Sequence, residues 1–101
     1  MRTLSLIALA AAAALATPAS ATGVIKCNAG PQSKWKSPEA LTAKLKKKGW
    51  EVRKVKVDGG CYEAYGTTPK GERVEAYFHP VSLETLFIGR RGEVLFRKKG
   101  Y

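Results

Sequence analysis

The amino terminus decides how much of this 101-residue chain is left to fold. Arg2 gives a positive start to a run of mostly Ala and Leu residues, Thr17 and Pro18 interrupt that run, and Ala19-Ser20-Ala21 follows. This order is typical of a secretory signal peptide with a small-residue cleavage site. A membrane anchor would need roughly 20 apolar residues, and this run is shorter. We therefore predict a signal peptide over 1–21, cut after Ala21, and a periplasmic or secreted product.

Cys27 and Cys61 are the only two cysteines. In an oxidising compartment such a pair most simply forms a disulfide, and only one connectivity exists. Closing the 33 residues between them would contribute about 3 to 4 kcal/mol, a large share for a domain with so small a core. A redox or zinc role would need a CxxC pair or further ligands, and His79 is the only histidine. We predict a structural disulfide and expect no cofactor and no metal.

The chain is strongly basic, with 18 Lys and Arg against 8 Asp and Glu and a net charge of +10, or +9 once Arg2 is removed with the signal. This charge favours anionic partners, such as an acidic protein face, lipid phosphates or nucleic acid, in a salt-dependent way. A lysine-rich surface also simply keeps a small domain soluble, so both interpretations stay open. Every apolar run after the signal is interrupted by Lys, Arg or Gly, so we expect no membrane span.

One helix is predicted after an extended lead-in, 22–36, which Cys27 would attach to the rest. Ser37 supplies an N-cap hydroxyl, Pro38 suits the first helical position and Glu39 lies near the positive end of the helix dipole. A modest apolar side and a lysine-rich last turn follow, and Gly49 ends the helix.

The rest of the chain predicts short antiparallel strands. Val52 differs in parity from Val55 and Val57, so all three can face the core only if a bulge lies near Arg53-Lys54. Asp58-Gly59-Gly60 is a tight-turn signal that leads into a second strand from Cys61. A third strand, 72–78, alternates between an apolar face with Val74, Ala76 and Phe78 and a polar face with Arg73, Glu75 and Tyr77.

Two further short strands are plausible on either side of the basic turn Gly89-Arg90-Arg91-Gly92, before a basic end at 97–101. The predicted fold class is therefore α+β: one N-terminal helix packed on an antiparallel β-meander of three to five strands, stapled by one disulfide. We expect a monomer.

Residues 37–86 resemble a PepSY domain of the small exported type. The matching features are the helix that ends in Lys48-Gly49-Trp50, the valine-rich strand 52–57, the block Gly60-Cys61-Tyr62-Glu63-Ala64-Tyr65, and the strand 73–78 that closes on His79-Pro80-Val81. The Gly-Cys-Tyr-Glu block, with an upstream Cys shortly after the signal, is the most specific of these. The predicted organisation is a PepSY-like domain over 37–88 and a basic C-terminal hairpin or tail over 89–101.

The resemblance implies an α+β fold and a non-catalytic module, since PepSY domains occur in the propeptides of secreted metallopeptidases and are linked to protease inhibition. The sequence departs from the family after Pro80-Val81. The family usually turns on a Thr-Gly pair there, whereas this chain has Ser82-Leu83 and continues past the usual end.

Four aromatic residues are candidates for binding a protein partner: Trp50, Tyr62, Tyr65 and Tyr77. If Tyr62 and Tyr77 project from the sheet face opposite the helix, they would form an aromatic patch framed by Lys and Arg, the composition of a binding hot spot. The alternative is that they are cross-strand pairs that merely cover a sheet face. Pairing of an extended peptide with an exposed sheet edge is a second route to binding.

Catalysis is not expected. Glu63 and Glu75 can come close on adjoining strands, but carboxylates among so many cations are more often salt-bridge partners than an acid and base pair. His79 precedes Pro80 at a strand end and is more simply a turn residue than a base. The Gly89–Gly92 turn does not open a helix, so it is no phosphate loop.

Nucleic acid is not an expected partner either, because an exported protein does not meet its usual targets. A continuous basic stripe over an aromatic sheet face would favour a polyanion binder. Charges on the helix and the tail would instead favour a protein-binding module. The sequence predicts an exported PepSY-type module that inhibits a protease or regulates a periplasmic partner, with binding to anionic surfaces or polyanions as the alternative.

Overall fold

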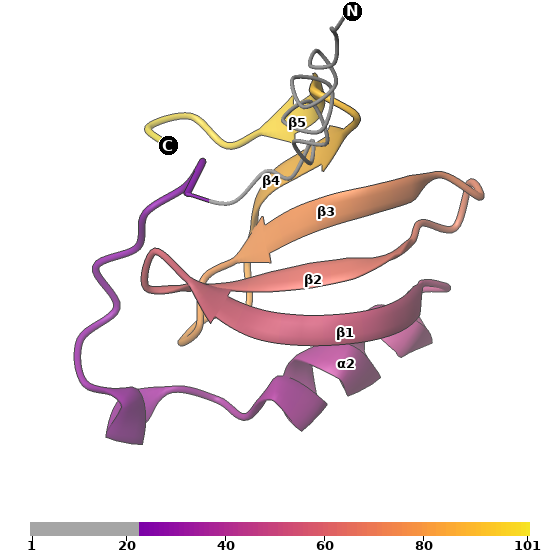
Figure 1. The fold of residues 1–101 in the computed structure, drawn as a ribbon. Helices are drawn as coiled ribbons and strands as arrows, with labels where there is room; N and C mark the ends of the chain where they lie inside the picture. Colours follow the sequence, from indigo (N-terminus) through magenta and orange to yellow (C-terminus); the bar gives the residue numbers. More distant parts are fainter. Residues whose placement is uncertain (1–22) are drawn as a thin grey trace, which may run out of the picture.

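The computed structural model describes residues 23–101, so the predicted signal peptide lies outside the described residues. A 3-10 turn, one α-helix and five strands follow one another along the chain (Figure 1): η1 (Gln32–Lys34), α2 (Pro38–Lys47), β1 (Glu51–Asp58), β2 (Cys61–Thr67), β3 (Arg73–Phe78), β4 (Thr85–Arg90) and β5 (Glu93–Arg97). Within this part of the chain, neither helix has the length and apolar character needed to cross a membrane.

The five strands form one antiparallel meander in the order β1-β2-β3-β4-β5. The helix α2 lies along one face of this sheet, beside β1 (Figure 1). The prediction of an α+β fold with one α-helix on an antiparallel meander is confirmed, with five strands. The strand β4 crosses the predicted boundary at 88/89, and β5 continues the same sheet.

The helix begins and ends where its capping residues predict. The Ser37 Oγ accepts a hydrogen bond from the Ala40 amide at 3.0 Å, which satisfies a free N–H of the first turn. Gly49 has a φ of 95°, the left-handed conformation that ends many helices, and the Trp50 amide then donates to the Leu45 carbonyl at 3.0 Å. Leu41 and Leu45 are the buried residues of α2 and face the sheet.

The bulge predicted in β1 is confirmed. The register between β1 and β2 shifts between Val52 and Lys54, and Val52 lies opposite Gly66 while Val55 lies opposite Ala64. Both valines pack against the cluster between helix and sheet. One extra residue in β1 thus brings valines of different parity to the same face.

Apolar side chains are buried on both faces of the sheet. The cluster on the α2 side joins helix and sheet and consists of Leu41, Leu45, Tyr62, Ala64, Ala76, Phe78 and Leu83. We call the opposite face the far face. Its cluster is smaller and consists of Ile25, Cys61, Tyr77, Leu86 and Phe87.

The lead-in covers part of the far face. The predicted disulfide is confirmed, with the Cα atoms of Cys27 and Cys61 5.1 Å apart. The Cys27 amide also donates to the Gly59 carbonyl at 2.8 Å, and the Ile25 side chain is buried. The lead-in therefore contributes to the core as well as being attached to it.

The turn between β3 and β4 keeps the geometry of a glycine turn without the glycine. Leu83 has a φ of 62°, and its amide donates to the His79 carbonyl at 2.7 Å. A left-handed conformation costs a non-glycine residue roughly 1 to 2 kcal/mol. The Leu83 side chain is buried in the cluster on the α2 side, which recovers about that much. Leu83 thus adopts the left-handed conformation at the position where the resemblance leads one to expect a glycine.

Candidate functional site

The far face carries charged and aromatic residues of the five strands in two rows across the sheet. Strand pairing aligns the first row in register from β1 to β5: Lys56, Glu63, Tyr77, Phe87 and Arg97. The second row lies beside it: Lys54, Tyr65, Glu75, Gly89 and Val94. Because side chains directly opposite one another on a sheet are in contact, each row is a chain of neighbours.

Glu63 lies near the middle of the first row and is fully buried. Its Oε1 atom is 3.7 Å from the Lys56 Nζ, and neither carboxylate oxygen has a hydrogen-bond partner among the described residues. Burial raises the pKa of Glu63 above its ordinary value, and the positive charge of Lys56 only partly opposes this. The sheet therefore holds a carboxylate in a place that disfavours its charged form.

Tyr65 carries two lysines over its ring. The Nζ atoms of Lys54 and Lys56 lie 5.4 and 5.5 Å from the ring centroid, which is the range of a cation–π interaction. Both lysines come from the neighbouring strand β1. The accessible part of this face beside β1 is thus cationic, with an aromatic ring beneath.

Tyr77 and Asp58 tie the far face to the lead-in. The Tyr77 hydroxyl donates to the Asp58 Oδ2 at 2.6 Å, and the Gly23 amide donates to the same oxygen at 2.6 Å. These two hydrogen bonds lower the pKa of Asp58, while burial and the bond to Asp58 raise the pKa of Tyr77. Asp58 therefore acts as an acceptor that orders the start of the described chain.

The four predicted binding residues do not lie on one surface. Tyr62 is on the α2 side, where its hydroxyl donates to the Lys36 carbonyl at 2.6 Å and its ring meets that of Trp35 edge-on. Tyr77 is on the far face and is fully buried. The condition for an aromatic patch of Tyr62 and Tyr77, that both project from the face opposite the helix, is not met, because Tyr62 lies opposite Phe78 and Tyr77 lies opposite Glu63.

The other two candidates are also separated. Trp50 is partly buried against the α2-side cluster, with its ring 6.1 Å from that of Phe78 in an edge-on arrangement. Tyr65 is on the far face and is only partly buried. The partner-binding role of all four stays a prediction, and Tyr65 is the one that lies among accessible charges.

Glu63 was not among the sequence candidates for binding. The signal that could have found it is strand parity, since Glu63 shares its face with Cys61, and Cys61 was expected to hold the lead-in over that face. His79 is where the sequence placed it, in a turn, with its Nδ1 accepting from the Val81 amide at 3.1 Å.

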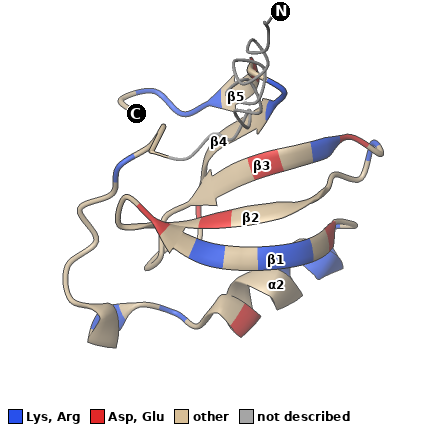
Figure 2. Ribbon diagram, viewed as in Figure 1, with Lys and Arg blue, Asp and Glu red and all other residues tan. Residues whose placement is uncertain are grey.

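Charge is mixed on the far face. Figure 2 shows basic residues along β1, on α2 and at the chain's end, and acidic residues within β2 and β3. The acids in β2 and β3 that share the far face are Glu63 and Glu75. The face therefore lacks the continuous basic stripe that a polyanion would need. Within residues 23–101, no three His, Cys, Asp or Glu side chains are placed to hold a metal ion.

Substitution of Glu63 by glutamine is expected to raise the free energy of unfolding at pH 7 by about 1 to 2 kcal/mol, because it removes a buried charge. Lys56 is 36% exposed, so water can solvate it once its partner is neutral. Because the folded pKa of Glu63 is raised, the unfolded chain ionises first as pH increases, and stability falls as pH rises through that window. The gain should therefore shrink as the pH falls from the raised pKa of Glu63 toward about 4, the range of an unfolded glutamate, and should vanish below it.

Urea denaturation of both proteins between pH 3 and pH 7 measures this difference. The hydrogen-bonded carboxylate of Asp58, whose pKa is lowered in the folded protein, stabilises both proteins less at low pH. Its effect therefore cancels in the difference between their free energies of unfolding. Glu93→Gln is the matched control, because Glu93 is 61% exposed and pairs with Arg90 at the surface. It should change stability by less than about 0.5 kcal/mol. A Glu63 variant less stable than wild type at pH 7 would mean that the ion pair with Lys56 outweighs burial.

The antiparallel meander, the helix packed on it and the disulfide define a small α+β domain with one cross-link. The model of one protein family, described as peptidase propeptide and YPEB domain, matches residues 5–87. The chain belongs to this family, PepSY_2, whose members are propeptide-like or regulatory modules and are generally not catalysts. The match ends at Phe87, within β4, so β5 lies beyond it. None of the curated proteins and none of the solved structures matches the chain.

Proposed function

We propose that this chain is an exported, non-catalytic binding module that regulates a partner protein, and that the partner is a peptidase. The observation that carries the proposal is the family match over 5–87, because the family is that of peptidase propeptide modules. Export is supported by the residue order of 1–21, and PepSY domains are typically extracellular or periplasmic, where a disulfide such as Cys27–Cys61 persists.

The charge distribution favours a protein partner over a polyanion. The accessible charges of the far face are the lysines of β1 and the partly buried carboxylate of Glu75 on β3, a mixed pattern that complements another protein surface better than a uniform row of phosphates. Of the other lysines, Lys44, Lys46 and Lys47 lie on α2, Lys48 is its C-cap, and Lys98 and Lys99 lie at the chain's end. Binding of anionic surfaces through those lysines is the competing function, and salt separates the two.

The test is capture of partners by the immobilised protein from an extract of the compartment in which it accumulates. We expect a peptidase to be retained at about 0.1 M salt and also at about 1 M salt, where surface charges are screened within about 3 Å. Excess protein should lower the activity of the captured peptidase. The accumulated protein should begin at Thr22 when its amino terminus is sequenced.

The control is a variant in which Lys46, Lys47 and Lys48 become glutamine, since these residues lie at the end of α2. It should retain the peptidase as wild type does. Elution of all bound material by salt, together with loss of binding in this variant, would establish the competing function instead. Undiminished activity of every co-resident peptidase at excess protein would refute the inhibitory role.

A further inference from the structure

The two edges of the sheet differ in how they are protected. The edge strands are β1 and β5, and an edge presents main-chain groups that can pair with another chain. Five of the eight residues of β1 are charged: Glu51, Arg53, Lys54, Lys56 and Asp58. The middle of β5, Val94-Leu95-Phe96, carries no charge. Charged side chains block an edge against added strands, and this means of protection is present along β1 and absent from the middle of β5. The register between β4 and β5 shifts between Ile88 and Gly89, so Leu95 is an extra residue and the regular edge of β5 runs from Phe96 toward Lys98.

The side chains of β5 offer apolar contact on both faces. Phe96 is 44% exposed and lies opposite Ile88, which packs on the α2 side. Val94 is 53% exposed and lies on the far face, where it lines a hollow of about 200 Å³ together with Phe87 and Arg97. A strand added to β5 would cover both residues. The alternation of apolar residues between faces is what edge recognition uses for specificity.

The main chain of β5 has groups that face away from β4. The Lys98 amide donates to the Leu86 carbonyl at 2.8 Å, so residue 98 points toward β4. Main-chain groups of an antiparallel strand alternate in direction, and those of Arg97 therefore point outward. Among the described residues, β4 is the only strand that pairs with β5.

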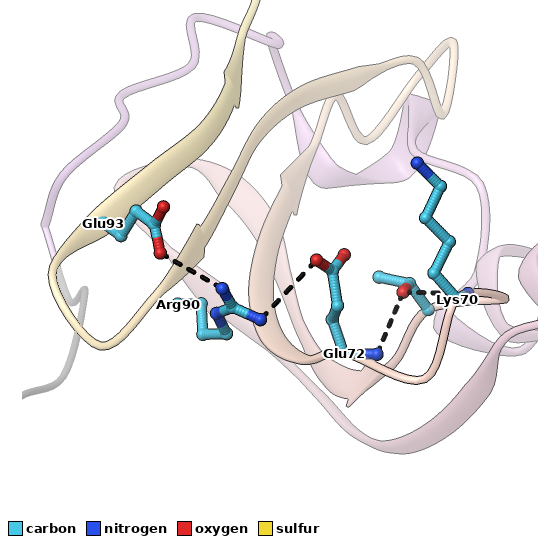
Figure 3. A network of polar contacts seen from close by, with 5 residues as sticks. Lys70, Glu72, Arg90 and Glu93 are labelled. Atoms are coloured by element: carbon cyan, nitrogen blue, oxygen red, sulfur yellow. Dashed lines mark hydrogen bonds and ion pairs between the residues drawn. The ribbon is translucent and has the colours of Figure 1, made fainter.

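The positive charge around β5 favours an acidic binding partner. Residues 90–101 contain five Lys and Arg and one Glu, a net charge of +4. Arg90 is already engaged, since its guanidinium pairs with Glu72 at 3.5 Å and Glu93 at 3.2 Å and so ties β5 to the β2–β3 turn (Figure 3). Arg91 and Lys99 have no ion pair within residues 23–101. They flank the strand at its two ends and leave uncompensated positive charge there.

We propose that the outer edge of β5 binds an extended acidic segment of the partner protein as a sixth strand of the sheet. The proposal rests on the proposed function, for which it names the binding surface and the chemistry of the bound segment. A second copy of this chain is a poor occupant, because pairing of two β5 strands would place two segments side by side that both stay positive after the ion pairs of Arg90 with Glu72 and of Lys98 with Glu84 are counted.

The probe is a seven-residue peptide, blocked at both ends, that alternates glutamate and valine. Its titration into isotopically labelled protein is followed by amide chemical shifts, with a peptide that alternates lysine and valine as the comparison. We expect saturable shifts at 93–97 with the acidic peptide only. Affinity should fall at least about tenfold between 0.05 and 0.5 M salt, since charge steers and holds the peptide.

Two substitutions at position 97 isolate the contribution of its main-chain N–H to peptide binding. Arg97→Ala and Arg97→Pro both lose the contact of the guanidinium with the Phe87 ring and its hydrogen bond to the Tyr101 oxygen. Only the proline variant also loses the outward N–H, and proline is tolerated where an edge N–H faces solvent. We expect Arg97→Pro to bind the acidic peptide at least about tenfold more weakly than Arg97→Ala.

A second pair of variants tests the apolar side chains of the edge without introducing proline. Phe96→Ser should weaken peptide binding about three- to tenfold. Val57→Ser is its matched control on β1, because Val57 has a similar exposure of 49%, and it should leave binding unchanged.

The proposal is overturned if the acidic peptide does not bind at millimolar concentration, if its shifts map to β1 or α2, or if both variant pairs bind alike. Dimerisation through β5, seen by sedimentation and cross-strand contacts, would also overturn it. Retention of a peptidase by both wild type and Arg97→Pro would leave the proposed function standing and refute only the β5 edge. Failure to retain any partner would refute the proposed function itself.

Discussion

Replacing Cys27 and Cys61 together by alanine is expected to lower the free energy of unfolding by about 3 to 4 kcal/mol. The disulfide closes a loop across 34 positions, and its loss releases entropy in the unfolded chain. Alanine is the suitable replacement because Cys61 is fully buried in an apolar cluster, and alanine brings no polar group into it. Urea denaturation at pH 7 measures the loss, and a domain of this size has little stability to spare.

Reducing agent provides the control for this prediction. It should destabilise wild type by a similar amount and leave the alanine variant unchanged. Hydrogen exchange should also quicken at residues 23–27 and at Tyr77, which packs with Ile25, because this part of the lead-in is then held mainly by the packing of Ile25 and by the hydrogen bonds of Gly23 and Cys27. A loss of less than about 1 kcal/mol would show that these contacts alone attach the lead-in.

The features that the sequence predicted well are local. The helix start at Ser37-Pro38, its end at Gly49 and the turn at Gly59-Gly60 each depend on residues within one turn of chain. The bulge near Arg53 was also predictable, because Val52 and Val55 differ in parity and can pack against the same cluster only if one extra residue lies between them. Val57 does not join that cluster and is 49% exposed.

The positions of the tyrosines were not predictable in the same way. Their faces depend on the register between β2 and β3, and a shift of one residue moves a side chain to the other face. Tyr62 lies opposite Phe78, so Tyr62 and Tyr77 are on different faces. The sequence correctly predicted which residues of one strand share a face. No local feature specifies how two neighbouring strands align.

Burial of Glu63 was missed for a related reason. A charged residue in a strand is normally expected at the surface. Here Lys56 and Tyr77 flank it in register from the two neighbouring strands. The sequence shows the disulfide partner Cys61 two residues away, but only the fold shows which neighbours bury the carboxylate.

Substitution of Gly60 by alanine is expected to cost about 2 to 4 kcal/mol, because two penalties combine at this position. Gly60 has a φ of 81°, which strains any residue with a side chain. A Cβ atom there would also lie 2.5 Å from the Cys27 carbonyl oxygen, closer than such atoms can approach. Glycine is therefore required at position 60 both by the positive φ of the turn and by the close approach of the lead-in.

Gly71→Ala separates the two penalties, since Gly71 has a similar φ of 87° but nothing within 4 Å of the added Cβ. It should cost only about 1 to 2 kcal/mol. In the variant that lacks both cysteines, the cost of Gly60→Ala should fall toward that of Gly71→Ala, because the Cys27 carbonyl is then free to move away. Thermal or urea unfolding of the four proteins gives a coupling of about 1 to 3 kcal/mol. Equal costs in both backgrounds would mean that the disulfide does not hold the Cys27 carbonyl against the turn, and that the lead-in is positioned by its other contacts.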